Sequence, residues 1–249
     1  MIGYHFQRAV NDWPRAVAIL PEGTPIKAVD SVQFLDEAKR INPGVVTILR
    51  HWYDPDQKFE GDYENRARRF LASFVDGTFD NYAHNVDYIE GWNEYLANSQ
   101  NAAEIAERVK WVKALCMVWS REYRTQQKYA HIRLIVANAA IGNDIPLDMA
   151  RAAYEWDAVL GYHPYMPWKN GKRMEGEQRY YSMRWQYMDD WYRTQDIYCD
   201  WIFTEMGPLN YTEHQGGIFL DGGGGWKHPD VCAGNVQCYL NSLADYIDD

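Results

Sequence analysis

Short apolar runs that alternate with amphipathic stretches constrain the fold of this chain more than any other feature. Seven such runs, each five to seven residues long, are rich in Val, Ile and aromatic side chains. This composition and length are typical of buried strands. The runs lie at Ile2–Phe6, Ile26–Asp30, Val45–His51, Tyr88–Asn93, Ile132–Asn138, Ala158–His163 and Trp201–Glu205.

The stretches between these runs follow a helical pattern. In the longest, Ala102–Gln127, apolar residues such as Ile105, Val109 and Val112 recur close to a 3.6-residue period. The other predicted helices are Asp12–Leu20, Ser31–Ile41, Tyr63–Phe74, Pro146–Trp156, Gln178–Ile197 and Pro229–Ile247. Strands that alternate with helices predict βα units built around a parallel sheet.

The loop after the first predicted strand distinguishes between two parallel folds. A doubly wound nucleotide-binding sheet normally has a glycine-rich fingerprint there, but this chain reads Gln7-Arg8-Ala9-Val10-Asn11. We therefore predict an α/β fold of the TIM (β/α)₈-barrel type. One domain over residues 1–249 suffices, because α/β barrels of 200–250 residues fold as a unit.

The barrel is expected to be incomplete at its C-terminus, where no eighth strand is evident. Three explanations stay open: the chain is truncated, Gly217–Leu220 serves as an irregular strand, or the barrel is open. The predicted region after the seventh strand is a long loop followed by one helix.

Charge and composition exclude several classes of protein. A net charge of −10 argues against nucleic-acid binding, which requires a basic patch. The sequence has no run of 18 apolar residues, so we expect no membrane span, and Met1–His5 begins no secretory signal. The histidines and cysteines lack metal-ligand spacing, so we expect neither a metal nor a cofactor. The oligomeric state and the cellular compartment stay open.

An excess of aromatic residues favours one kind of ligand. The chain contains 11 Trp and 19 Tyr, side chains that stack on the apolar faces of flat ligands such as sugar rings. A Trp-rich core explains the same composition equally well.

Two glutamates stand at predicted strand ends, where the active site of a barrel is built. The fourth run continues through Gly91-Trp92-Asn93-Glu94, and the seventh reads Phe203-Thr204-Glu205-Met206-Gly207. Glycoside hydrolysis requires two such carboxyl groups, one protonated to serve the leaving oxygen and one ionised to attack the anomeric carbon. The structural alternative is that each glutamate caps a helix or pairs with an arginine at the rim.

These two segments resemble the signatures of the 4/7 superfamily (clan GH-A) of retaining glycoside hydrolases. That clan has an Asn-Glu pair at the end of strand four and a Glu at the end of strand seven. The resemblance implies that Glu94 is the general acid/base, that Glu205 is the nucleophile and that Asn93 binds the sugar 2-hydroxyl. It implies cleavage of β-linked glycosides or polysaccharides by double displacement through a covalent glycosyl-enzyme.

Other strand ends fit the same resemblance. Arg50 and His51 are similar to the Arg and His that many clan members place beside the nucleophile, where a cation keeps the carboxylate ionised. His163 and Tyr165 resemble the clan's His-x-Tyr, with His163 expected near the acid/base and Tyr165 expected to donate to the nucleophile.

Further sugar contacts are expected from aromatic and polar residues near the strand ends. The clan's usual tryptophan on strand eight has no counterpart in a predicted strand, and Trp226 in the glycine-rich loop is the candidate replacement. The candidate stacking residues are Trp52, Tyr53, Trp92, Tyr95, Trp168 and Trp226, and the further subsite candidates are His5, Asp30 and Asn138. The alternative function is a non-catalytic carbohydrate-binding barrel or scaffold, and the sugar, the linkage and endo or exo action stay open.

Overall fold

The structure is a computed structural model, and it describes most of the chain. The described residues are 4–6, 13–51, 62–75, 77–92, 101–139, 143–169, 172–173, 183–205, 207–214 and 217–221. In 4–6, 166–169, 172–173, 207–214 and 217–221 the description covers the backbone alone.

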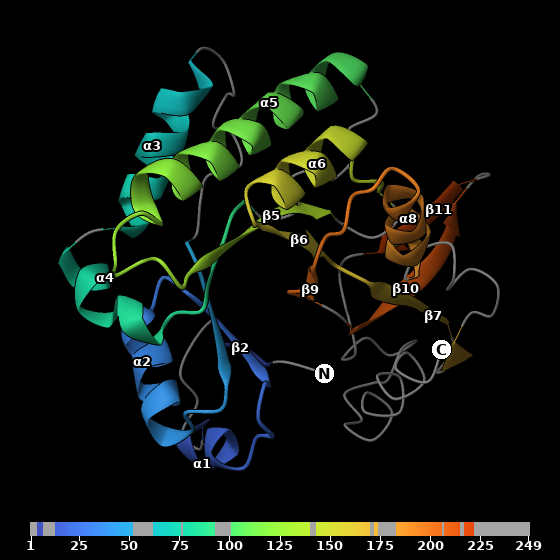
Figure 1. The fold of residues 1–249 in the computed structure, drawn as a ribbon. Helices are drawn as coiled ribbons and strands as arrows, with labels where there is room; N and C mark the ends of the chain where they lie inside the picture. Colours follow the sequence, from blue (N-terminus) through green and yellow to red (C-terminus); the bar gives the residue numbers. More distant parts are fainter. Residues whose placement is uncertain are drawn as a thin grey trace.

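A parallel sheet of seven strands forms the centre of the described chain (Figure 1). Its order is β1-β2-β3-β4-β5-β6-β9, and every neighbouring pair is parallel. Its strands are β1 Tyr4–Phe6, β2 Pro25–Val29, β3 Val46–Arg50, β4 Tyr88–Glu90, β5 Arg133–Ala139, β6 Val159–Tyr162 and β9 Trp201–Phe203. All seven predicted strands are therefore confirmed, each within a few residues of its expected bounds.

Helices connect these strands and cover one face of the sheet. They are α1 Trp13–Ala18, α2 Val32–Ile41, α3 Tyr63–Phe74, α4 Gly77–Tyr82 with the 3₁₀ turn η1 Ala83–Asn85, α5 Ala102–Val118 with the π-helical turn η2 Trp119–Tyr123, α6 Leu147–Glu155 and α8 Arg184–Arg193. Helix α3 lies against α5 and α5 against α6 on the outer side of the sheet (Figure 1). Side chains also fix where helices begin: the Asp62 carboxylate accepts bonds from the Glu64 and Asn65 amides, and Asn101 accepts one from Ala103.

The two faces of the sheet form two separate apolar clusters. Strand residues such as Leu49, Ile89 and Leu160 pack with the helices in the large outer core. Their neighbours Ile48, Ile135 and Val159 point the other way and form a small cluster inside the curve of the sheet. This division follows from the alternation of side chains along a strand.

The sheet is strongly curved, as a barrel wall must be. Strands β2 and β9 are five positions apart in the strand order, which would separate them by about 24 Å in a flat sheet. Yet Lys27 Nζ on β2 lies 3.2 Å from Oε1 of Glu205, which follows β9. A lysine side chain spans only about 6 Å, so the sheet must curl to bring these strand ends together.

The closed eight-stranded barrel is not present among the described residues. Strands β1 and β9 are the two edges of the parallel sheet, which corresponds to part of a barrel. Gly217–Leu220 does form a strand, β11 Gly217–Asp221, but this strand belongs to a second sheet and supplies no eighth barrel strand.

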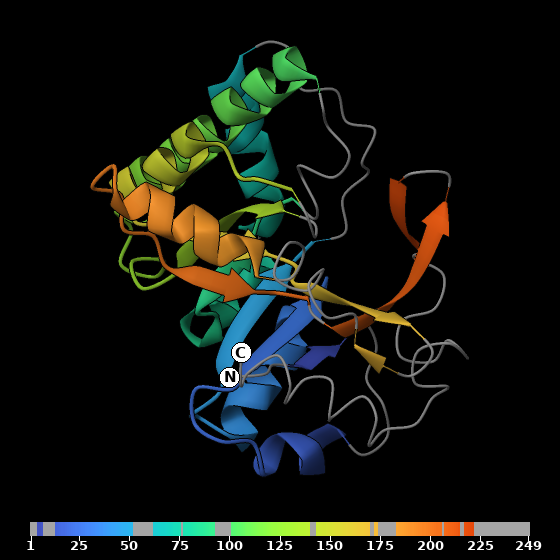
Figure 2. The same ribbon diagram turned by 90° about the vertical axis from the view of Figure 1, so that its right-hand side faces the viewer.

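This second sheet was not predicted. It has the order β11-β10-β7-β8, with β7 Tyr165–Lys169, β8 Lys172–Arg173 and β10 Gly207–His214. Strand β7 follows β6 after a short break, β10 begins soon after β9, and the two pair in parallel with Gly207 opposite Tyr165. The sheet extends beyond the strand ends of the parallel sheet (Figure 2).

Two other expectations concern helices, and the described chain tests the first. Its helices include none that is both long and apolar enough to cross a bilayer. The predicted helix Pro229–Ile247 lies outside the described residues.

A β-bulge in β5 turns one polar side chain towards the neighbouring strand. The register between β5 and β6 shifts between Val136 and Ala139, and Ala137 has a φ of 69°, in the left-handed region. The Asn138 side chain that follows is fully buried, and its oxygen occupies the space where a Cβ on Gly161 would lie, at 1.7 Å. Position 161 therefore requires glycine, because the Asn138 side chain occupies the space that a Cβ would need.

This contact predicts the effect of Gly161→Ala. The new methyl group would collide with Asn138 Oδ1 and lie 3.0 Å from Ile135 Cγ2, so we expect a loss of about 1–3 kcal/mol in the free energy of unfolding. Urea denaturation measures it. The control is Gly77→Ala, because a Cβ there meets no atom within 4 Å. Equal stability of the two variants would contradict the described packing of Asn138.

Candidate active site

The inner face of the curved sheet changes from apolar to polar towards the C-terminal strand ends. On β3, Ile48 is followed two residues later by Arg50, and on β4, Tyr88 is followed by Glu90. Residues two apart on a strand point to the same face. Arg50 and Glu90 are also register partners across the β3–β4 pair. The charged residues therefore form a layer above the apolar inner cluster.

Lys27 lies at the centre of this layer. Its Nζ is 3.0 Å from Oε1 and 2.8 Å from Oε2 of Glu90, and 3.2 Å from Oε1 of Glu205. The Lys27 side chain is 3% exposed and the Glu90 side chain is fully buried. The ammonium donates hydrogen bonds to Oε1 of Glu90 and Oε1 of Glu205, and its contact with Oε2 of Glu90 is an ion pair.

The Glu205 carboxylate has further partners from two other strands. Its Oε1 lies 3.1 Å from Arg50 Nη1, and its Oε2 accepts a hydrogen bond of 2.7 Å from the Tyr165 hydroxyl. The Glu205 side chain keeps 20% of its surface exposed. It is therefore an acidic group held from three sides and still open to a small molecule.

Among the described residues, the four charged groups of this layer balance. Lys27 and Arg50 are the cations, Glu90 and Glu205 are the anions, and their formal charges cancel. Burial of charge is tolerated when the charges are paired and hydrogen-bonded. Each of these four groups therefore lies next to a group of opposite formal charge.

The two histidines predicted for the site, His51 and His163, have different hydrogen-bond partners. His163 is fully buried, and its Nε2 lies 2.9 Å from the hydroxyl oxygen of Thr204, the residue before Glu205. His51 Nδ1 lies 2.7 Å from Oδ1 of Asp30, and its ring packs on Phe74 with centroids 4.3 Å apart. His163 is thus linked to the strand end that carries Glu205, whereas His51 is held by Asp30 at the end of the neighbouring strand.

Asn138 and Trp92 meet at the end of β4. The Asn138 amide nitrogen donates to the Trp92 carbonyl oxygen at 3.0 Å. Trp92 is partly buried against the outer core. These contacts fix the backbone from which the Asn93-Glu94 segment continues.

Several expected site residues cannot be placed. Asn93, Glu94, Trp52, Tyr53, Tyr95 and Trp226 lie outside the described residues. Trp168 lies in β7 and His5 in β1, where the structure describes the backbone alone. The described part of the site therefore consists of the Glu205 half.

Lys27 and Glu90 belong to this charged layer, and the sequence analysis did not single them out. A lysine within an apolar strand is a signal, because β2 reads Pro-Ile-Lys-Ala-Val and both neighbours of Lys27 are buried. Glu90 gives the same signal after Ile89. In a sheet covered on one face by helices, such residues must point to the inner face.

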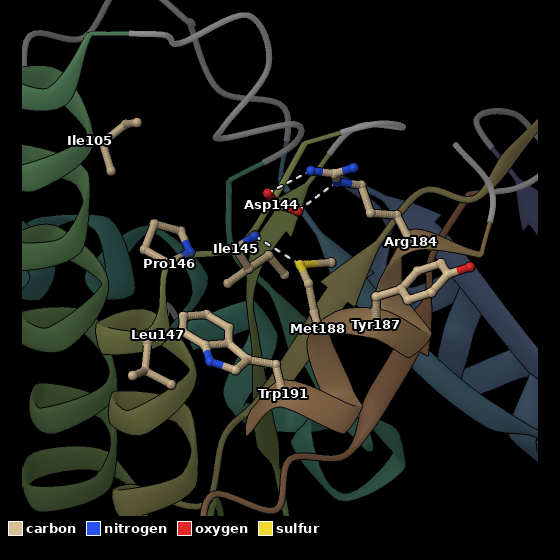
Figure 3. A pocket seen from close by; sticks show the side chains of 9 residues that line it. All are labelled: Ile105, Asp144, Ile145, Pro146, Leu147, Arg184, Tyr187, Met188 and Trp191. Atoms are coloured by element: carbon tan, nitrogen blue, oxygen red, sulfur yellow. Dashed lines mark hydrogen bonds and ion pairs between the residues drawn. The ribbon is translucent and has the colours of Figure 1, made fainter. Parts of the chain in front are cut away.

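A cavity lies in the helical layer, between the N-terminal end of α6, one side of α8 and one side chain of α5 (Figure 3). It has a volume of about 510 Å³ and its wall is mainly apolar, with Ile105, Leu147 and Trp191 among the lining residues. Asp144 on its edge binds Arg184 through two hydrogen bonds of 2.5 and 2.7 Å. Asp144 is the one carboxylate among the described lining residues, and it is paired with Arg184, so these residues form no acid pair.

Comparison with known proteins gives a likeness to solved structures and none in sequence. No protein-family model and no curated protein sequence matches the chain. A similar solved structure is that of PbGH5A, a glycoside hydrolase family 5 enzyme from Prevotella bryantii B14. It is 13% identical with a TM-score of 0.49, and the match covers 81% of this chain and 67% of that chain. These values assign the chain to no family, so the functional argument comes from its side chains.

The balanced charges predict that Glu205 stabilises the fold. Glu205→Gln removes the anion that faces both Lys27 and Arg50, so we expect the free energy of unfolding to fall by about 2 kcal/mol in urea denaturation. Glu122→Gln is the control, since Glu122 pairs with Arg68 at the surface and its loss should change stability little. A Glu205→Gln variant more stable than the wild type would show that the two cations do not depend on this carboxylate.

Proposed function

We propose that this chain is a retaining glycoside hydrolase that cleaves β-linked glycosides or polysaccharides by double displacement. Glu205 is the nucleophile and Glu94 the general acid/base in this proposal. The observation that carries it is the Glu205 carboxylate itself, which stands at a strand end, partly exposed, with contacts to Lys27, Arg50 and Tyr165.

The contacts of Glu205 suit attack on an anomeric carbon. Two cations favour the ionised carboxylate, and the Tyr165 hydroxyl orients its second oxygen. The attack forms a bond from a carboxylate oxygen to the anomeric carbon while the glycosidic oxygen leaves with a proton from the acid. Water then attacks the anomeric carbon of the glycosyl-enzyme, the bond to Glu205 breaks and its carboxylate is released, and the former acid, now a base, accepts the proton of the water.

The position of the proposed acid in the sequence is compatible with a place beside Glu205. Glu94 follows Glu90 by four residues, so their Cα atoms are at most about 14 Å apart. Glu90 in turn shares the Lys27 ammonium with Glu205. A retaining mechanism requires the two catalytic carboxyl groups to be about 5–5.5 Å apart, which this linkage allows. Asn93, beside Glu94, is proposed to bind the 2-hydroxyl.

The sugar-binding residues are proposed from the same strand ends. His51 and His163 lie at the ends of β3 and β6, and Trp92 follows β4. Trp52, Trp168 and Trp226 are proposed as stacking residues. Binding of an oligosaccharide without turnover is the competing function, and the test below separates it from hydrolysis.

Hydrolysis of aryl β-glycosides, β-glucan, β-mannan and xylan tests the proposal. We expect a product of retained configuration, a loss of about 10²–10⁴-fold in kcat for Glu94→Gln, and no turnover for Glu205→Gln. Azide should restore turnover of the Glu205→Gly variant, with a glycosyl azide as the product. In the wild type, a 2-fluoro glycoside should label the peptide that contains Glu205. The surface variant Glu122→Gln should keep the wild-type rate.

Two results would overturn this assignment. Wild-type rates in both Glu94→Gln and Glu205→Gln would show that neither glutamate takes part in catalysis. Binding of an oligosaccharide with no product after long incubation would favour the carbohydrate-binding barrel.

The hydrogen bond from Tyr165 gives a separate prediction. Tyr165→Phe removes a donor to a charged acceptor, so kcat should fall by about 10–100-fold with the fold intact. Steady-state kinetics with an aryl glycoside measures the change. Tyr154→Phe, at an exposed position on α6, is the matched control. Unchanged kcat in Tyr165→Phe would mean that the phenol does not act on the reacting carboxylate.

A further inference from the structure

We propose that Lys27 is a positioning residue that holds the Glu205 carboxylate ionised and in place, with Glu90 as its anchor. The kinetic part of this inference rests on the proposed hydrolase function. The electrostatic part concerns the charge of one carboxylate and can be measured without turnover.

The first argument is the cost of placing a lysine here. A buried ammonium without partners is very unfavourable, and an apolar residue at position 27 would suit a strand between buried Ile26 and Ala28. Replacement of buried ion pairs by apolar residues is often neutral or stabilising. Stability alone is therefore a weak reason for a lysine and a glutamate at these positions.

The second argument is the geometry of the three groups. Glu90 holds Lys27 Nζ with both oxygens, at 2.8 and 3.0 Å, from a strand in the middle of the sheet. The third contact, to Glu205 at 3.2 Å, reaches a residue just beyond the end of an edge strand. Lys27 thus connects the acidic group at the rim to two strands in the body of the fold.

The third argument is the direction of the two cations. Lys27 and Arg50 come from β2 and β3, and both lie within 3.2 Å of the same oxygen, Oε1 of Glu205. Two fixed cations on one oxygen hold the carboxylate plane, while Tyr165 from β7 binds the other oxygen. Preorganised charge of this kind needs no rearrangement during reaction.

The alternative role for Lys27 is to neutralise Glu90 and nothing more. The two roles can be separated, because Lys27→Met with Glu90→Gln removes one cation and one anion together. The remaining pair, Arg50 and Glu205, stays balanced. This double variant should therefore fold even if Lys27→Met alone does not.

The experiment measures the titration of Glu205 and the kinetics in the same proteins. Glutamate ¹³C-labelled at Cδ reports each carboxyl group by NMR, and Glu205→Gln assigns the resonance of Glu205. The pH dependence of kcat/KM is measured with an aryl β-glycoside. The charged or titratable groups that face Glu205 in the described chain are Lys27, Arg50, Tyr165 and, beyond Lys27, Glu90, while His163 binds the adjacent Thr204.

The inference predicts opposite shifts in two variants. In the double variant the titration of Glu205 and the acidic limb of kcat/KM move to higher pH, because the nearer charge lost is the cation. In Glu90→Gln alone, the Glu205 titration and the acidic limb of kcat/KM move to lower pH or stay at the wild-type pH, because only an anion is lost. In the double variant kcat falls at least about tenfold while KM stays within about twofold. The variant Lys27→Arg with Glu90 intact keeps the cation. Its acidic limb of kcat/KM should therefore lie nearer to that of the wild type than the limb of the double variant does.

Each contrary outcome has a distinct meaning. A double variant with wild-type kcat and an unmoved Glu205 titration overturns the inference and leaves Lys27 as the partner of Glu90 alone. If the wild type cleaves no glycoside, the proposed function fails, and the NMR titration still decides the role of Lys27. A Glu205 titration that moves to lower pH in the double variant also overturns it.

Discussion

The ammonium group of Lys27 is the point on which the described inner face depends. It brings a carboxylate from the middle of the sheet and another from beyond an edge strand within hydrogen-bond distance of the same nitrogen. A flat sheet could not bring these groups together, so the ion pairs require the curl of the strands. The curl in turn encloses a layer of charge above the small apolar cluster of Ile48, Ile135 and Val159. Fold and site are therefore consequences of the same geometry.

Much of the fold could be predicted from periodicity because each βα unit has its own local signal. The seven strands of the parallel sheet and the amphipathic α3 appear where the hydrophobic pattern places them. Helix α4 lacks such a signal, since Gly-Thr-Phe-Asp-Asn-Tyr is short and contains poor helix formers. The second sheet was missed because the pair that joins its two hairpins, β7 with β10, links distant segments of the chain, and because β10 begins with Gly-Pro.

The site was predicted less completely, for a physical reason. Glu205, Arg50 and Tyr165 stand at strand ends and resemble a known pattern, and the structure brings the three together. Lys27 lies within β2, and Glu90 lies within the predicted strand Tyr88–Asn93, although it is the last residue of β4. A charged residue inside a predicted strand is easily taken for an exposed one. Only the curvature shows that these two positions face each other and the rim. Local patterns thus identify the edge of such a site, whereas its interior depends on tertiary geometry.

The second sheet gives the site an unusual mechanical connection. Tyr165 is the first residue of β7, Glu205 stands two residues before β10, and the two strands are paired with Tyr165 opposite Gly207. Glu205 is also two residues beyond β9, so its carboxylate stands at the junction of the small sheet and the barrel wall, which carries Lys27 and Arg50. A displacement of the small sheet would carry Tyr165 with it and would change the distances from the Glu205 carboxylate to its partners. A force that displaces the small sheet would therefore change the electrostatic surroundings of the Glu205 carboxylate.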